Sequence, residues 1–365
     1  MAGDSADQNR KRPTVAAALV EDEKRPDEDD EKINAGAVQR RRVATSERED
    51  RIARLVHHVR YEQATEYEPR VGWYTPYRFC MEDISCLDLD EESTIGLGQP
   101  LEDMTESDVD NLYGGVNVLS VKILKSDVGF PVNIYGTVLV RDEFDFKCNY
   151  IFRRDRNDYQ LVKAQGEALT LTGPYRGPAM LDGLYFEINL KIRCDGEATD
   201  RHFSKGILQS VPSYRERTMR INHSSWLSEL ELAYTPVYFA VEAIIGLTVL
   251  KGPQKFFGNI KACTTEKPDD HAVLYDSEAS GTDSTVGDDG SLALSRNLVV
   301  LRVDEELIVK ICVYKGNSRY KKTTTVITLG HSDTSVDVNQ GCYKLRLKIE
   351  WSGISESWAL LRNDS

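Results

Sequence analysis

Short runs in which apolar and polar residues alternate constrain this chain more than any other feature. They begin near Val116, are rich in Val, Ile, Leu, Tyr and Thr, and are separated by Gly, Asp and Asn. Alternation with a period of two is typical of half-buried strands, and regular short strands between turns indicate a sandwich or barrel. The predicted fold class is therefore mainly β. The clearest runs are VNVLSVKIL at 116, VNIYGTVLV at 132, LYFEINLKI at 184, LIVKICVY at 307 and KLRLKIEW at 344.

The β region also resembles itself at a nearly constant offset. Gly136 in YGTV corresponds to Gly258 in FGNI, and four more pairs follow in the same order: IF at 151 with VL at 273, LTL at 169 with LAL at 292, INLKI at 188 with LIVKI at 307, and LEL at 230 with LRL at 345. This order favours two tandem β-sandwich-like repeats, at 116–235 and 236–352, over chance similarity among strands. A tandem pair creates a groove near Pro236, and binding residues usually lie on loops.

The segment that precedes the repeats has a different composition. Residues 1–44 are a charged tail, which includes DEKRPDEDDEK, and we predict disorder because little apolar surface offsets the chain entropy. Ser46 and Glu49 then form a capping-box pattern. One short amphipathic helix is predicted to follow. Its apolar face could bind a partner, but we favour a helix that packs on its own domain or forms only transiently. That face consists of Ile52, Leu55, Val56 and Val59.

Residues 45–78 combine this helix with an aromatic strap that is interrupted by Pro69 and Pro76. We expect the strap to lie extended on the protein and to pack its aromatic rings in the core, although a Pro-rich or base ligand is an alternative. The segment 79–115 is an acidic lead-in with no Lys or Arg and eleven acids, and 353–365 is a C-terminal tail. The aromatic residues of the strap are Tyr67, Trp73, Tyr74, Tyr77 and Phe79.

Charge, cysteine usage and hydropathy predict an intracellular protein, cytoplasmic or nuclear. Seven cysteines without a C-x-x-C pair indicate reduced thiols. The N-terminus lacks the apolar region of a secretory signal, and the best apolar run, 237–250, is too short and carries Glu242, so no transmembrane segment is expected. Basic clusters at 10–12 and 40–42 are interpreted either as a nuclear address or as a solvated tail. The net charge of −13 argues against generic binding to a phosphate backbone.

Enzyme motifs are not found in the sequence. It contains no G-x-S-x-G, G-x-x-x-x-G-K-[ST], G-x-G-x-x-G or H-E-x-x-H pattern, and the six histidines lack metal-ligand spacing. No catalytic, cofactor-binding or metal-binding residue is therefore assigned. Acidic loops could hold Ca²⁺ for lipid binding, but Asp also forms turns unaided, and turn chemistry is favoured. The aspartates of these loops are Asp155, Asp158, Asp276, Asp283, Asp288 and Asp289.

Three basic patches lie beside tyrosines, at 153–156, 215–220 and 319–322. Such patches could meet RNA by base stacking and phosphate contact. Arg beside Tyr is also common on β proteins, so a protein partner is expected rather than nucleic acid.

Several motifs resemble one cereal family. SVKILKSDVGFPVNIYGTVLVRD at 120, LTLTGP at 169, FFGNIKACTT at 256 and the acidic MEDISCLDLDEESTIG at 81 are similar to the grass domain-of-unknown-function family 6598, over about residues 79–352. Some relatives resemble jasmonate-induced cereal proteins that also carry a ribosome-inactivating N-glycosidase domain. The resemblance thus implies a stress or defence setting. The glycosidase activity is not carried over, because its E-x-x-R pair is absent from this sequence.

The expected function is a non-enzymatic interaction module of a plant protein. Its binding surface would lie on loops at strand ends or in the groove between the repeats. Two alternatives remain open: an enzyme whose active site is assembled from distant strands, and a calcium-dependent lipid-binding β-sandwich.

Overall fold

The structure is a computed structural model that describes residues 28–355, except for 182, 211–216, 280–281 and 316–317. The chain divides into two compact units, Met1–Ala53 and Arg54–Ser365. Among the described residues, those of the first unit are helical, and every strand lies in the second unit. The predicted mainly β fold is confirmed. None of the helices in the described ranges is long and apolar enough to cross a membrane.

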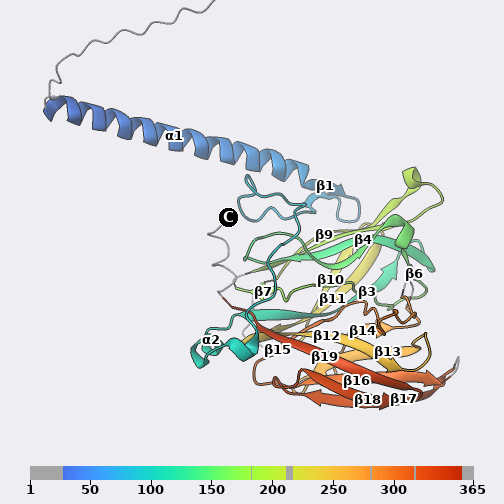
Figure 1. Ribbon diagram of the computed structural model, residues 1–365. Coiled ribbons are helices and arrows are strands. Elements are labelled where there is room, and N and C mark those ends of the chain that lie inside the picture. Colours follow the sequence, from blue (N-terminus) through green and yellow to red (C-terminus); the bar gives the residue numbers. More distant parts are fainter. Residues whose placement is uncertain (1–27, 182, 211–216, 280–281, 316–317, 356–365) are drawn as a thin grey trace, which may run out of the picture. The chain divides into compact units, whose positions relative to one another are not determined.

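Residues 114–237 form one pair of antiparallel sheets (Figure 1). One sheet has the strand order β10-β11-β3-β7, and the other has β5-β4-β8-β9, with β6 beside β4. Buried apolar residues from both sheets, such as Val121, Ile134 and Phe186, share one core. The strands are β3 (Gly114–Ser126), β4 (Val132–Arg141), β5 (Asn149–Arg154), β6 (Gln160–Val162), β7 (Ala179–Met180), β8 (Leu184–Ile192), β9 (Arg201–Ser210), β10 (Met219–Ser225) and β11 (Ser228–Val237).

Residues 240–353 form a second pair of sheets, coloured from yellow to red in Figure 1. Their strand orders are β15-β12-β19-β18 and β14-β13-β16-β17. A separate core, which includes Ile260, Val309 and Leu347, lies within this pair. The strands are β12 (Ala240–Lys251), β13 (Gly258–Thr264), β14 (Ala272–Asp276), β15 (Leu298–Arg302), β16 (Leu307–Lys315), β17 (Ser318–Leu329), β18 (Ser335–Gln340) and β19 (Tyr343–Gly353).

The two sheet pairs have the same connectivity. The order β5-β4-β8-β9 in the first corresponds to β14-β13-β16-β17 in the second, and β10-β11-β3-β7 corresponds to β18-β19-β12-β15. When the strands of each pair are taken in chain order, corresponding strands therefore occupy the same positions in the two sheets of their pair.

A small apolar cluster joins the two sheet pairs. Ala179 from the first pair, Ala240 and Val300 from the second, and Ile354 after β19 are buried together. Beside it the carboxylate of Glu242, which is fully buried, accepts hydrogen bonds from the backbone N–H of Gly177 and from the Ser352 hydroxyl. Because Gly177 precedes β7 and Glu242 lies on β12, this carboxylate links the pairs directly.

The helix is longer than the sequence pattern predicts. Helix α1 (Glu28–Gln63) begins within the segment 1–44, so Ser46 and Glu49 lie inside it and do not cap its start. No proline occurs between Pro26 and Pro69, and proline is the residue that most strongly ends a helix. Residues 1–27 of the predicted tail lie outside the described residues. The apolar face is exposed, with Leu55 at 58% and Val59 at 54%, which does not support packing of that face on its own domain.

The aromatic strap divides into an exposed and a buried part. Strands β1 (Thr65–Glu68) and β2 (Trp73–Pro76) form a hairpin on which Trp73 is 71% and Tyr74 66% exposed, so the prediction of core packing is wrong for these two rings. Phe79 is fully buried and stacks against Phe146, as that prediction requires. The difference arises because Phe79 follows the hairpin and lies on the sheet of β8, next to Tyr185.

Short helices occupy the acidic lead-in and two loops. The capping box of α2 (Glu106–Asp110) is formed by Thr105 and Asp108, whose side chains each bond the other's backbone N–H. The remaining single turns are η1 (Leu101–Asp103), η2 (Arg156–Asp158) and η3 (Glu197–Thr199).

Candidate functional site

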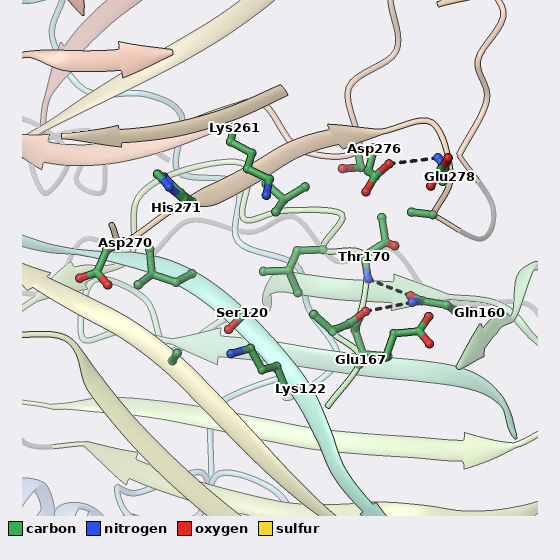
Figure 2. Close-up of a pocket in the computed structure, with 18 of the residues that line it drawn as sticks. Ser120, Lys122, Gln160, Glu167, Thr170, Lys261, Asp270, His271, Asp276 and Glu278 are labelled. Atoms are coloured by element: carbon green, nitrogen blue, oxygen red, sulfur yellow. Dashed lines mark hydrogen bonds between the residues drawn. The ribbon is translucent and has the colours of Figure 1, made fainter. Parts of the chain in front are cut away.

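A groove of about 700 Å³ lies between the two sheet pairs of the second unit. The first pair contributes β3, β6, β10 and β11 to its walls, and the second contributes β13 and the loop and strand that follow it. Figure 2 shows Ser120 and Lys122 on one wall and Lys261 and His271 on the other. This volume lies within the usual range for ligand sites in proteins.

The first wall is held in place by the side chain of Gln160. The segment 167–171 runs along β3, where the Leu169 N–H donates to the Val121 carbonyl at 2.8 Å. On the other side of that segment, the Gln160 amide accepts from the Thr170 N–H at 2.8 Å and donates to the Ala168 carbonyl at 3.1 Å (Figure 2). Gln160 is only 2% exposed. Its amide therefore takes the place of a neighbouring strand and satisfies a backbone edge that would otherwise be unpaired.

The opposite wall is the connection from β13 to β14. Asp270 in this connection accepts a hydrogen bond from the hydroxyl of Thr218, which precedes β10, so the wall is tied to the first sheet pair. Burial, together with the cations of Lys310 and Lys261, lowers the pKa of the His271 imidazole, although Asp269 and Asp270 oppose this. Its Nδ1 is buried and has no hydrogen-bond partner among the described residues.

The groove carries side chains of both charge signs around one exposed apolar side chain. Lys122 and Arg220 share one carboxylate, that of Glu231, with N–O distances of 3.5 and 2.9 Å. Lys261 lies on the other wall, and Asp276 stands at one end, where it accepts from the Glu278 N–H at 3.1 Å (Figure 2). Among the described residues that line this groove, Val273 on β14 is the one large apolar side chain that is well exposed, at 38%.

The aspartates predicted as turn or calcium residues mostly form turns. Asp283 accepts from the Thr285 N–H at 2.8 Å, and Asp289 accepts from the Ser291 N–H at 2.9 Å. Asp158 pairs with Arg154 at 3.0 Å. Of the six predicted aspartates, only Asp276 lines the groove. In the described ranges no three His, Cys, Asp or Glu side chains come close enough to hold a metal ion.

The predicted basic patch at 153–156 is neutralised by acidic partners. Arg153 pairs with Glu92 of the acidic lead-in at 2.8 Å and lies over the Tyr150 ring at 4.2 Å. Arg156 pairs with Asp200 at 2.7 Å. These guanidinium groups already have anionic partners, which weakens the case for phosphate contact. Parts of the other two patches, residues 215–216 and the side chains of 319–322, lie outside the described residues.

Two of the histidines are held by packing or by contact with the backbone. His223 lies within 3.3 Å of the Lys205 carbonyl, and the ring of His331 packs edge-on against Trp351. The seven cysteines are free thiols: Cys80, Cys148, Cys263 and Cys312 are buried, Cys194 is half-buried, and Cys86 and Cys342 are exposed. The prediction of core thiols thus holds for four of the seven.

The sequence contains no signal that singles out the residues of this groove. Gln160, Lys261 and His271 match no motif, and they meet only because two sheet pairs pack together. Only the expectation of a groove between two repeats points to this region.

Comparisons with solved structures give distant likenesses. Human GIVD cytosolic phospholipase A2 matches with a TM-score of 0.22 and 9% identity over 67% of this chain and 30% of that one. The C2A and C2B domains of Extended-Synaptotagmin 2 match with a TM-score of 0.22 and 5% identity over 72% of this chain and 97% of that one. The calcium-bound form of those domains gives a TM-score of 0.23 and 7% identity over 69% and 97%. Scores this low carry no argument about function. No curated protein matches the sequence.

A family match covers more than half of the chain. Residues 115–349 match the family described as "Domain of unknown function (DUF6598)". The match covers most of the chain and both sheet pairs, and it is narrower than the span of 79–352 expected from the motifs, since the acidic lead-in lies outside it. The chain therefore belongs to the DUF6598 family.

Proposed function

We propose that this protein is a non-enzymatic interaction module and that the groove between its sheet pairs binds an extended segment of a partner protein. The observation that carries the proposal is Val273, an exposed apolar side chain in a groove that is lined mostly by charged and polar residues. Protein interfaces typically combine a small apolar contact with a polar surround. Because the groove carries both Lys and Asp side chains, the complementary segment would carry both signs of charge.

The organisation in two repeats is part of this proposal. Repeats at 116–235 and 236–352 would explain why strand order is the same in the two sheet pairs. A binding groove then arises from duplication, because two copies in tandem enclose a surface that one copy lacks.

The setting of the protein is inferred more indirectly. Seven free cysteines, four of them buried, favour a reducing compartment, so we place the protein in the cytoplasm or nucleus. The resemblance of its motifs to cereal proteins supports a grass origin and a role in stress or defence.

Affinity capture with matched variants tests the groove. The full-length tagged protein would be incubated with extract of stressed cereal leaves, beside the variants Val273→Asp and Val326→Asp. Val326 is a suitable control because it is an exposed valine, at 58%, on β17 of the same sheet. A partner that the wild type and Val326→Asp retain, and that Val273→Asp loses at least tenfold by quantitative mass spectrometry, supports the proposal. If every captured protein is retained equally by Val273→Asp, the groove is not the binding surface.

A further inference from the structure

A second pocket, of about 370 Å³, lies on the outer face of the sheet β5-β4-β8-β9. Its floor is formed by side chains that the strand register places side by side. Asn189 on β8 is opposite Thr137 on β4 and Lys205 on β9, and the next outward residue of β8, Lys191, is opposite His202. Strap residues beyond the hairpin cover the neighbouring part of the same face. The pocket is therefore the portion of a polar sheet face that the strap leaves open.

The acids at this pocket are already neutralised. Glu187 forms a buried ion pair with Arg141 at 2.8 Å, and Asp90 pairs with Arg78 at 2.9 Å. The Lys205 ammonium is 2.5 Å from a carboxylate oxygen of Glu66 and 3.6 Å from the centre of the Tyr77 ring. Each acid thus has a cation of its own.

Lys191 differs from these cations. It lines the pocket, and among the described residues its ammonium group has neither a hydrogen bond nor an ion pair. Its near neighbours include the Lys205 ammonium and the His202 imidazole. Burial lowers the pKa of His202, and the ammonium groups of Lys205 and Lys191 lower it further. The positive charge of Lys191 is therefore uncompensated inside a concave site.

Two neutral groups beside Lys191 also lack partners. The Oδ1 atom of Asn189 and the Nδ1 atom of His202 are buried, and neither has a hydrogen-bond partner within the described ranges. The His202 ring packs against the Trp226 ring, with ring centres 4.7 Å apart. Buried polar atoms normally have partners, and two orphans in one pocket therefore indicate a ligand with hydrogen-bonding groups.

We propose that this pocket binds a small, hydroxyl-bearing oxyanion, such as a sugar phosphate or a sugar acid. The anionic group would lie against Lys191, and a ligand hydroxyl would donate to Asn189 Oδ1. A phosphate and a carboxylate can each pair with the Lys191 ammonium. The ligand class is therefore defined by an oxyanion with hydroxyl groups beside it. This site is separate from the groove, and its residues come from the first sheet pair, the strap and the acidic lead-in.

Calorimetric titration of the full-length protein tests the proposal. The probes are glucose 6-phosphate, gluconate, inorganic phosphate and uncharged glucose, each at constant ionic strength. Binding of glucose 6-phosphate, gluconate or both, tighter than inorganic phosphate and with no heat from glucose, is the expected result. Binding by only one of the two identifies its anionic group as the preferred one. If neither binds, or if glucose binds as tightly, the proposal is overturned.

Two substitutions link any binding to the pocket. Lys191→Met should weaken the affinity at least tenfold, whereas Lys251→Met, which removes an exposed lysine at the end of β12, should leave it unchanged. Asn189→Leu should weaken binding of the hydroxyl-bearing anions while that of inorganic phosphate stays the same. Melting curves establish that each variant is folded, and Lys191→Gln replaces Lys191→Met if the latter is not. Unchanged affinity in a folded Lys191 variant contradicts the assignment.

Discussion

Gly136 on β4 and Gly258 on β13 make the same close approach in the two sheet pairs. A β-carbon at Gly136 would collide with the Asn189 carbonyl oxygen of β8, and one at Gly258 would collide with the Cys312 carbonyl oxygen of β16. Gly136 also has a φ of +117°, which only glycine adopts without strain. The two glycines are 122 positions apart, as the predicted repeat requires.

Alanine substitution at either glycine should destabilise the protein. We expect Gly136→Ala to lower the free energy of unfolding by about 2–4 kcal/mol, from backbone strain plus a steric clash, and Gly258→Ala by about 1–3 kcal/mol from the clash alone. Gly246→Ala on β12 is the matched control, because the nearest atom to its β-carbon would be Lys348 Cβ at 3.8 Å. Its effect should stay within about 0.5 kcal/mol. Urea denaturation measures all three variants, and an effect at Gly136 or Gly258 no larger than that at Gly246 would contradict the close approach.

Stability should fall between about pH 5 and pH 7 because of Glu242. Burial raises the pKa of this carboxyl from an ordinary 4.5 to about 7, despite the hydrogen bond from Gly177. In that interval the unfolded chain releases the proton while the folded protein keeps it. The stabilisation is therefore complete below the unfolded pKa and is lost as the pH rises through the folded pKa, up to about 3 kcal/mol in all.

Glu242→Gln isolates this contribution. Glutamine keeps an acceptor for the Gly177 N–H and the Ser352 hydroxyl but does not titrate. The free energy of unfolding of the variant should change less than that of the wild type between pH 5 and pH 7.5, as measured by urea denaturation at each pH. Parallel pH profiles would show that Glu242 is not the titrating group.

Calcium should leave the melting temperature unchanged. Asp283 and Asp289 each accept a hydrogen bond from a backbone N–H of their own loop. Hydrogen bonds from Thr285 lower the pKa of the Asp283 carboxyl, and the side chain and N–H of Ser291 lower the pKa of the Asp289 carboxyl. A ligand that binds only the folded state would raise its stability by about 2.7 kcal/mol at one hundred times its dissociation constant. Scanning calorimetry with millimolar Ca²⁺, and with Mg²⁺ as control, measures this. A rise specific to Ca²⁺ that Asp283→Asn abolishes would restore the calcium hypothesis.

Local patterns in the sequence determined the strands and much of their burial. Alternation with a period of two can be recognised without knowing the neighbouring strands, because it depends only on which face of a strand meets the core. The run that forms β8 is an example. The pair Gly136 and Gly258 could also be found in advance, because a glycine within a strand marks a close backbone approach. The start of α1 could not, because the capping-box pattern of Ser46 and Glu49 lies inside the helix and does not mark its first turn.

Only the tertiary structure decided which charged and polar groups meet. Arg153 is neutralised by Glu92 of the lead-in, and Lys191 remains unpaired although acids lie in the same pocket; neither follows from the neighbours of those residues in the chain. Partners in a β protein come from strands and loops far apart in sequence, so their electrostatics depend on how the sheets pack. The physical reason is range: strand periodicity is set by adjacent residues, whereas a groove or a pocket is set by long-range contacts between sheets.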